Sequence, residues 1–188
     1  SDPLSVITYN TTTSAKFNQS IQIANDITKI NPYGTINYSL SSLAISSSGG
    51  FTISFWGKLY AKHSVSLYGS LIGWNTTNAS PMYFDIAEGF DVGNGLGLLG
   101  QNGSPTPSSN TTTIISGVDP IINYWYHFCL TCSTSKVMTL YINGVGTSAT
   151  LLNDFTINNM WLGRSGAGNT KPFAGEIDDV RIYKARVF

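Results

Sequence analysis

Apolar and polar residues alternate with a period of two along much of this chain. In residues 51–56 the side chains of Phe51, Ile53 and Phe55 share one parity, and residues 125–132 repeat the pattern. Such alternation predicts β-strands that bury one face and keep the other face polar. The i, i+3, i+4, i+7 spacing of an amphipathic helix does not persist over any long window.

Two local signals refine this prediction. Asn143-Gly144 lies between β-forming residues, and an Asn-Gly pair is typical of a type I′ hairpin turn, because both central positions need positive φ. Residues 175–183 also have the composition of a strand, but their apolar parity changes part-way along. A bulge at Asp178-Asp179 would restore a single apolar face, so we expect a β-bulge there.

The sequence as a whole predicts an all-β fold, a two-sheet antiparallel β-sandwich. Short runs rich in Ile, Val, Thr, Tyr and Phe recur between clusters of Gly, Asn, Ser and Pro, which is typical of sandwiches and barrels. The turn-forming stretches 41–50 and 101–113 are too short to separate domains. Residues 1–188 are therefore expected to form a single domain, long enough to bury a core without disulfides.

Composition narrows the classes of partner. Ten Lys and Arg balance ten Asp and Glu, and this zero net charge argues against nucleic acid as a partner. Charged residues make up 11% of the chain, against about 25% in an average domain. The surface is thus polar mainly through hydroxyls and amides, which suits a hydroxyl-rich ligand or close packing against a neighbour. No stretch approaches the roughly 18–20 apolar residues of a membrane helix, so no membrane insertion is expected.

The two cysteines are expected to be free thiols. Cys129 and Cys132 lie in the predicted strand 125–132, so their Cα atoms would be about 10 Å apart, with the side chains on opposite faces. A disulfide needs Cα atoms within about 7 Å. Free thiols favour assembly in a reducing environment over secretion.

The strand motifs, taken in order, form a longer-range pattern. They are Phe-Thr-Ile-Ser-Phe-Trp at 51–56, Trp-Tyr-His-Phe at 125–128, Leu-Tyr-Ile-Asn-Gly at 140–144, Leu-Gly-Arg-Ser at 162–165 and Phe-Ala-Gly-Glu-Ile-Asp-Asp-Val-Arg-Ile-Tyr at 173–183. Their order and spacing resemble the laminin-G-like jelly-roll domains of the concanavalin A-like lectin/glucanase superfamily, over about residues 15–185. The resemblance implies two face-to-face antiparallel sheets with Greek-key connections. It also implies that residues 17–23 form the first core strand and that the first and last strands pair.

The resemblance leaves the function and the metal content open. Family members include carbohydrate-binding modules, adhesion domains and add-on domains of larger surface or virion proteins. Members that bind calcium commonly have an acidic residue in the first strand's loop, whereas residues 17–20 contain no carboxylate. A separate calcium hypothesis rests on four residues with oxygen ligands at every third position: Asp85, Glu88, Asp91 and Asn94. These four converge if the segment is a loop and scatter if it forms two strands.

Catalytic signatures are weak. Residues 176–179 are similar to the Glu-x-Asp-x-Glu strand of the superfamily's glycanases, but Val180 occupies the position of the second Glu. His63 and His127 are the only histidines, and the sequence has no nucleophile elbow, although a serine–histidine–aspartate arrangement stays open until distances are known. Residues 95–100 match Gly-x-Gly-x-x-Gly, but a turn-forming segment follows where a dinucleotide site needs a helix. We therefore expect a protein that is not an enzyme and has no cofactor other than calcium.

A sugar site needs an exposed aromatic ring beside groups that hydrogen-bond to hydroxyls. Trp74-Asn75 precedes the polar stretch 76–81, which indicates a partly exposed indole. The predicted ligand contacts are Trp74, Asn75, Asp85 and Asp91. The leading hypothesis is a non-catalytic surface recognition module that binds carbohydrate, like a lectin, through loops at the sandwich edge.

Two alternatives stay open. The chain could be a structural or adhesion domain decorating a virion or cell-surface assembly, with a neighbouring surface or capsid protein, or a second copy of itself, as its partner. It could also be an accessory module of a glycosidase whose catalytic domain lies elsewhere in the same gene. The leading hypothesis and the first alternative place it on the surface of a virion or cell.

Overall fold

β-strands form the regular structure of the computed structural model, which describes residues 6–10, 16, 20–24, 36–39, 44–62, 69–77, 82–90, 95–102, 112–151, 154–164 and 173–184. In chain order the strands are β1 (Val6–Asn10), β2 (Ser20–Ala24), β3 (Ile36–Ser39), β4 (Phe51–Leu59), β5 (Gly69–Thr77), β6 (Met82–Phe90), β7 (Gly95–Asn102), β8 (Thr112–Ile115), β9 (Trp125–Cys132), β10 (Val137–Ile142), β11 (Val145–Thr150), β12 (Thr156–Leu162) and β13 (Ala174–Tyr183). Within these ranges no helix has the length and hydropathy needed to cross a membrane.

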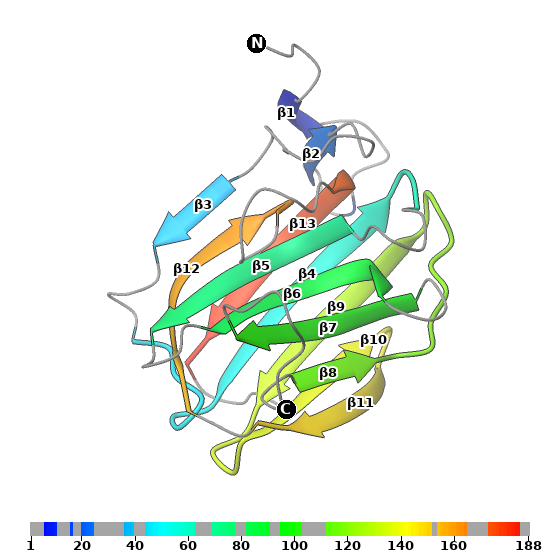
Figure 1. Ribbon diagram of the computed structural model, residues 1–188. Helices are drawn as coiled ribbons and strands as arrows, with labels where there is room; N and C mark the ends of the chain where they lie inside the picture. Colours follow the sequence, from blue (N-terminus) through cyan, green and yellow to red (C-terminus); the bar gives the residue numbers. More distant parts are fainter. Residues whose placement is uncertain are drawn as a thin grey trace.

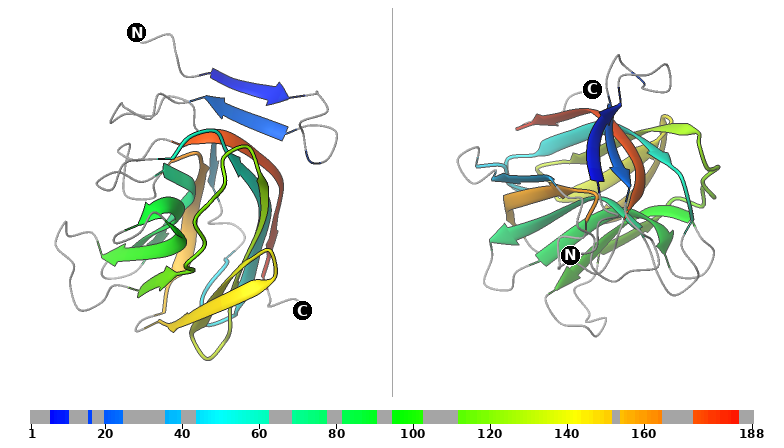
Figure 2. Two further views of the ribbon diagram at one scale, coloured as in Figure 1. Left: turned by 90° about the vertical axis from the view of Figure 1, so that its right-hand side faces the viewer. Right: turned by 90° about the horizontal axis from the view of Figure 1, so that it is seen from above.

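The strands form two antiparallel sheets that lie face to face (Figures 1 and 2). One sheet has seven strands in the order β1-β2-β13-β4-β9-β10-β11, and the other has six in the order β3-β12-β5-β6-β7-β8. The chain crosses repeatedly between the sheets, as in a Greek key, because consecutive strands such as β3 and β4, or β8 and β9, belong to different sheets. The predicted two-sheet antiparallel sandwich is confirmed.

The core lies between the sheets and contains the residues whose parity predicted it. Phe55 on β4 stacks on Phe128 on β9, with ring centroids 4.8 Å apart. Phe155 bridges the sheets, because its ring centroid lies 5.9 Å from that of Phe51 and 4.8 Å from that of Phe84. Burying each such side chain contributes about 1.5–3 kcal/mol.

Both local signals in the sequence are confirmed. β10 and β11 form a hairpin whose turn residues, Asn143 and Gly144, have φ values of 50° and 85°. The register of β13 against β4 shifts between Asp178 and Arg181, and Asp179 there has a φ of 50°. This bulge changes which side chains of β13 face outward.

The first predicted core strand corresponds to β2, which pairs with β13 as expected. β1 lies outside β2 and extends the sheet by one strand, so the partner of the last strand is second in chain order. Cys129 is half-buried and Cys132 is buried, and both are free thiols, as predicted. The glycine-rich residues 95–100 form part of strand β7.

Candidate functional site

Trp74 lies in the core and not at the surface. Its indole is 0% exposed and stacks on Phe84, with ring centroids 5.3 Å apart and an interplanar angle of 14°. The prediction of a partly exposed Trp74 is therefore wrong. The physical reason is that β5 continues to Thr77, so Trp74 sits inside a strand and its parity directs the indole between the sheets.

Asn75 and Asp85 lie on neighbouring strands of the six-stranded sheet, with Asn75 half-buried and Asp85 buried. The side-chain Oδ1 of Asn75 accepts a hydrogen bond of 3.1 Å from the backbone N–H of Asn159, where the register of β12 shifts. The amide of Asn75 thus satisfies a backbone donor beside a bulge. Asp85 is 2% exposed and lies opposite Gly73. Asp91, the fourth predicted contact, lies outside the described residues.

The structure describes the backbone of two of the four residues of the calcium hypothesis. Asp85 and Glu88 belong to one strand, β6, in which residues three positions apart are about 10 Å from each other. Asp91 and Asn94 lie outside the described residues. In the described part of the chain, no group of three or more His, Cys, Asp or Glu side chains is placed to hold a metal ion.

The seven-stranded sheet carries aromatic and charged side chains on the face turned away from the core. We call this the outer face; on β4 and β9 it includes Ser54, Trp56, Lys58, Trp125 and His127. Strand register places Lys58 opposite Trp125 and Trp56 opposite His127. The Nζ of Lys58 lies 4.9 Å from the ring centroid of Trp125, and the rings of Trp56 and His127 are 5.0 Å apart. The outer face therefore carries two aromatic rows, spaced by about 7 Å along the strands.

A buried ion pair anchors one of these rows. Glu176 on β13 is 0% exposed, and the Nζ of Lys58 lies 2.5 Å from its Oε1. The hydroxyls of Ser20 and Tyr60 also donate hydrogen bonds to this carboxylate. The hydrogen bonds from these donors offset the free-energy cost of removing the Glu176 carboxylate from water. Glu176 thus holds three strands and the start of a loop together, and it is enclosed rather than presented to a substrate.

Tyr60 extends the outer face beyond the end of β4. Its ring lies 5.5 Å from the Nζ of Lys58, and Gln22 donates a hydrogen bond of 3.4 Å to its hydroxyl. Burial, together with the hydrogen bond to Glu176, raises the pKa of Tyr60. The hydroxyl therefore stays protonated and acts as a donor to the carboxylate.

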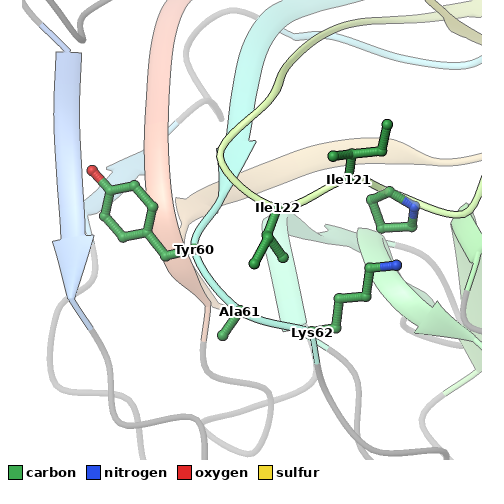
Figure 3. A pocket seen from close by; sticks show the side chains of 6 residues that line it. Tyr60, Ala61, Lys62, Ile121 and Ile122 are labelled. Carbon is green, nitrogen blue, oxygen red and sulfur yellow. The ribbon is translucent and has the colours of Figure 1, made fainter.

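An open pocket of about 610 Å³ lies beside Tyr60, where the end of β4 meets the segment before β9 (Figure 3). We call it the edge pocket; its lining is Tyr60, Ala61, Lys62, Pro120, Ile121 and Ile122. Figure 3 shows Tyr60 at one end of the pocket and Lys62 with Ile121 at the other. Ile121 is 65% exposed and Ile122 is 47% exposed, so one wall is apolar and open to solvent.

Hydrogen bonds fix the two walls of the edge pocket. The backbone N–H of Asn123 donates to the carbonyl of Leu59 at 2.7 Å. The backbone N–H of Ile121 donates to the hydroxyl of Tyr126 at 2.8 Å, and the rings of Tyr124 and Tyr126 are in edge contact at 5.0 Å. The loop wall is therefore tied to both strands of the β4–β9 pair, at the end where Lys58 pairs with Trp125.

Ser54 and His127 are in contact in the other aromatic row. The Oγ of Ser54 lies 3.0 Å from Nε2 of His127, and Trp56 covers one side of the imidazole. Asp179, the carboxylate whose charge acts on His127, accepts a hydrogen bond of 2.8 Å from Nε of Arg181. Ser54 and His127 therefore lie within hydrogen-bond distance, as a serine–histidine–aspartate arrangement requires. The carboxylate of Asp179 is bound by Arg181 instead.

Desolvation lowers the pKa of His127 below its ordinary value of 6.5, and the charge of Asp179 opposes this shift more weakly. The unfolded chain then binds more protons than the folded chain near this pH, so stability is expected to fall as the pH drops below about 6.5. We expect His127→Gln to reduce the change in the free energy of unfolding with pH below about 6.5. Urea unfolding of both proteins across this range measures the effect, and superimposable pH profiles would contradict it.

The outer face and the edge pocket were missed by the sequence prediction, although a signal existed. Trp56 and Trp125 have the parity of the polar residues in their strands, which places these aromatic rings opposite the core. The two exposed isoleucines in residues 120–126 are a second signal, because they stand in a loop. Half-buried indole and phenol rings beside charged and hydroxyl groups can stack on apolar faces of a ligand and hydrogen-bond to its polar groups.

The amino-acid sequence of the chain matches the model of a known protein family. The family model described as the concanavalin A-like lectin/glucanases superfamily, of the laminin G type, matches residues 32–187. No curated protein sequence matches the chain.

Solved structures with the same fold are similar to the chain at low sequence identity. Domain 4 of AbnA, an extracellular arabinanase from Geobacillus stearothermophilus in complex with arabinotriose, has a TM-score of 0.65 at 17% identity, over 96% of this chain and 76% of that one. The Ruminococcus gnavus IT-sialidase CBM40 bound to α2,3-sialyllactose has a TM-score of 0.60 at 16% identity, over 90% and 91%. The Trypanosoma rangeli sialidase in complex with sialic acid has a TM-score of 0.61 at 11% identity, over 97% and 28%. The neighbours thus include a carbohydrate-binding module, a domain of an arabinanase and a sialidase of which the match covers 28%.

Proposed function

Because the chain belongs to the concanavalin A-like lectin/glucanases superfamily, we propose that it is a non-catalytic carbohydrate-binding domain. Its site is the part of the outer face around Lys58, Trp125 and Tyr60, together with the edge pocket that Tyr60 also lines. The loop at residues 120–124 supplies the second wall, so recognition takes place at one edge of the sandwich.

The observation that carries this proposal is that aromatic rings of the outer face lie next to an open pocket, with Tyr60 belonging to both. Trp125 and Tyr60 both lie against the ammonium group of Lys58, and Tyr60 continues into the edge pocket. Sugar rings have apolar faces edged with hydroxyls, and flat, amphipathic side chains bind them at low conformational cost. The hydroxyl- and amide-rich composition suits the same ligands.

The neighbours support the same class of ligand. The arabinanase domain was solved with arabinotriose and the CBM40 domain with sialyllactose, so this sandwich holds oligosaccharides in two other proteins. The enclosure of Glu176 by Lys58, Ser20 and Tyr60 supports binding without hydrolysis, because a general acid or base must reach the scissile bond.

A more specific role is that of an accessory module in a glycan-cleaving enzyme. The observation that favours it is that each of the three structures above is a sialidase or belongs to a sialidase or an arabinanase. The parent reading frame tests this directly: a glycosidase domain in the same gene would support the role, and a gene for a structural surface protein would contradict it.

Trp125→Ala is expected to lower the affinity for the bound glycan about 30-fold, because truncation of an aromatic anchor costs about 2 kcal/mol. Tyr183→Ala is the matched control, since Tyr183 is an exposed aromatic residue on the same sheet that pairs with Thr52 at the other end of β4. Glycan-array screening followed by calorimetric titration measures both variants. Equal loss in the two, or no loss in Trp125→Ala, would contradict the proposed site.

A further inference from the structure

Among the described residues, the lining of the edge pocket contains one charged residue, and that charge is paired. The Nζ of Lys62 lies 2.6 Å from Oδ1 of Asp119, a residue next to the lining residue Pro120. The other lining residues are Tyr60, Ala61, Pro120, Ile121 and Ile122, which carry no charge at neutral pH. The Asp119 side chain is 67% exposed, so its carboxylate faces solvent at the end of the pocket where Lys62 lies.

Two cations of the outer face, Lys58 and Arg181, are paired with carboxylates in the same way, whereas the ammonium group of Lys16 lies over the ring of Trp56, 4.0 Å from its centroid. Lys58 is bound by the buried carboxylate of Glu176 at 2.5 Å. Further along the face, Nε of Arg181 lies 2.8 Å from Oδ1 of Asp179. A negatively charged ligand at the edge pocket would therefore have to displace a carboxylate from its cation, and each such exchange removes one ion pair to form another.

From these pairs we infer that the site takes uncharged oligosaccharides and that Asp119 excludes acidic ones. This inference rests on the proposed function and deepens it. An acidic sugar placed against Lys62 meets the exposed Asp119 carboxylate, which repels it and competes for the same ammonium group. A neutral sugar meets neither effect, because its hydroxyls accept from the paired ammonium and donate to the carboxylate without breaking the ion pair. Repulsion by the Asp119 carboxylate thus sets the preference for neutral over acidic sugars, while the aromatic rings supply the affinity.

Asp119→Asn tests the inference because it frees Lys62 and removes the repulsion while keeping the size of the side chain. The control is Asp154→Asn, which breaks another exposed pair, that of Asp154 with Lys136 at 3.1 Å. Asp154 lies at the opposite end of β4, where its carboxylate accepts a hydrogen bond from Ser47. The probes are an array of neutral oligosaccharides, including lactose and arabinotriose, each set beside its sialylated or uronic-acid counterpart.

The wild-type protein is expected to bind neutral members of these pairs, with an affinity that does not change between low and high salt. Asp119→Asn should raise the affinity for the acidic counterparts, relative to the affinity for their neutral partners, about two- to five-fold, the range of a single exposed ion pair. Asp154→Asn should leave the affinities for neutral and for acidic glycans unchanged. Preference of the wild-type protein for acidic glycans, or an equal gain for both classes in Asp119→Asn, overturns the inference and leaves the binding function standing. A wild-type protein that binds no glycan overturns both.

Discussion

Replacing Glu176 by alanine is expected to lower the free energy of unfolding by about 3–5 kcal/mol. The substitution leaves the ammonium group of Lys58 buried at 6% exposure without its carboxylate, and an unpaired buried charge is strongly destabilising. It also removes the acceptor of the Ser20 and Tyr60 hydroxyls. Urea unfolding monitored by tryptophan fluorescence measures the change.

A double variant separates two contributions to stability: the cost of leaving Lys58 without its carboxylate and the net effect of the Lys58–Glu176 ion pair. The double variant Lys58→Met with Glu176→Leu removes both charges at similar volume, and we expect it to be more stable than Glu176→Ala alone. It leaves the Ser20 and Tyr60 hydroxyls without their acceptor, so full recovery is not expected. A double variant as unstable as Glu176→Ala would show that packing around Glu176, and not the unpaired ammonium, causes the loss.

Gly175→Ala is expected to destabilise the fold by about 3 kcal/mol, at the upper end of ordinary overpacking. A Cβ at this position would lie 2.0 Å from the backbone carbonyl oxygen of Lys58 and 2.5 Å from the ring of Phe173. β13 is held between β2 and β4 in the sheet, so its backbone has no free direction in which to move. Circular dichroism during urea unfolding gives the free energy and the midpoint.

Gly117→Ala is the control for the Gly175 substitution. Gly117 has a φ of +72° and open space around a new Cβ, so the variant carries only the cost of a left-handed backbone, about 1–2 kcal/mol. An effect at Gly175 no larger than that at Gly117 would mean that β13 and β4 can separate locally without loss of the sheet.

Much of the fold could be predicted from the sequence because its signals are local. The alternation around Phe55 and Phe128 depends only on the strand period of two, and these residues meet in the core as expected. The turn at Asn143-Gly144 and the bulge at Asp178-Asp179 follow from backbone preferences and from parity within single segments. The opposite faces of the two cysteines follow from strand geometry in the same way.

The candidate site could not be predicted in the same way, because its parts come from distant segments. Trp74 and Trp125 are both tryptophans in strands beside polar residues, yet one is in the core and the other on the outer face. The choice depends on which face of each strand meets the opposing sheet. The choice between a glycan ligand and a neighbouring surface protein also stays a prediction, since composition suits both.

The sequence by itself determined the strand periodicity, the hairpin and the bulge, because each depends on residues that are close together in the chain. The order of the strand motifs along the chain also indicated the family. Only the tertiary structure decided which aromatic rings reach the surface and which charges are paired. Tyr60 and Glu176 are 116 positions apart and meet only because β4 and β13 pair in one register. Long-range strand pairing joins such residues, and no local pattern specifies it.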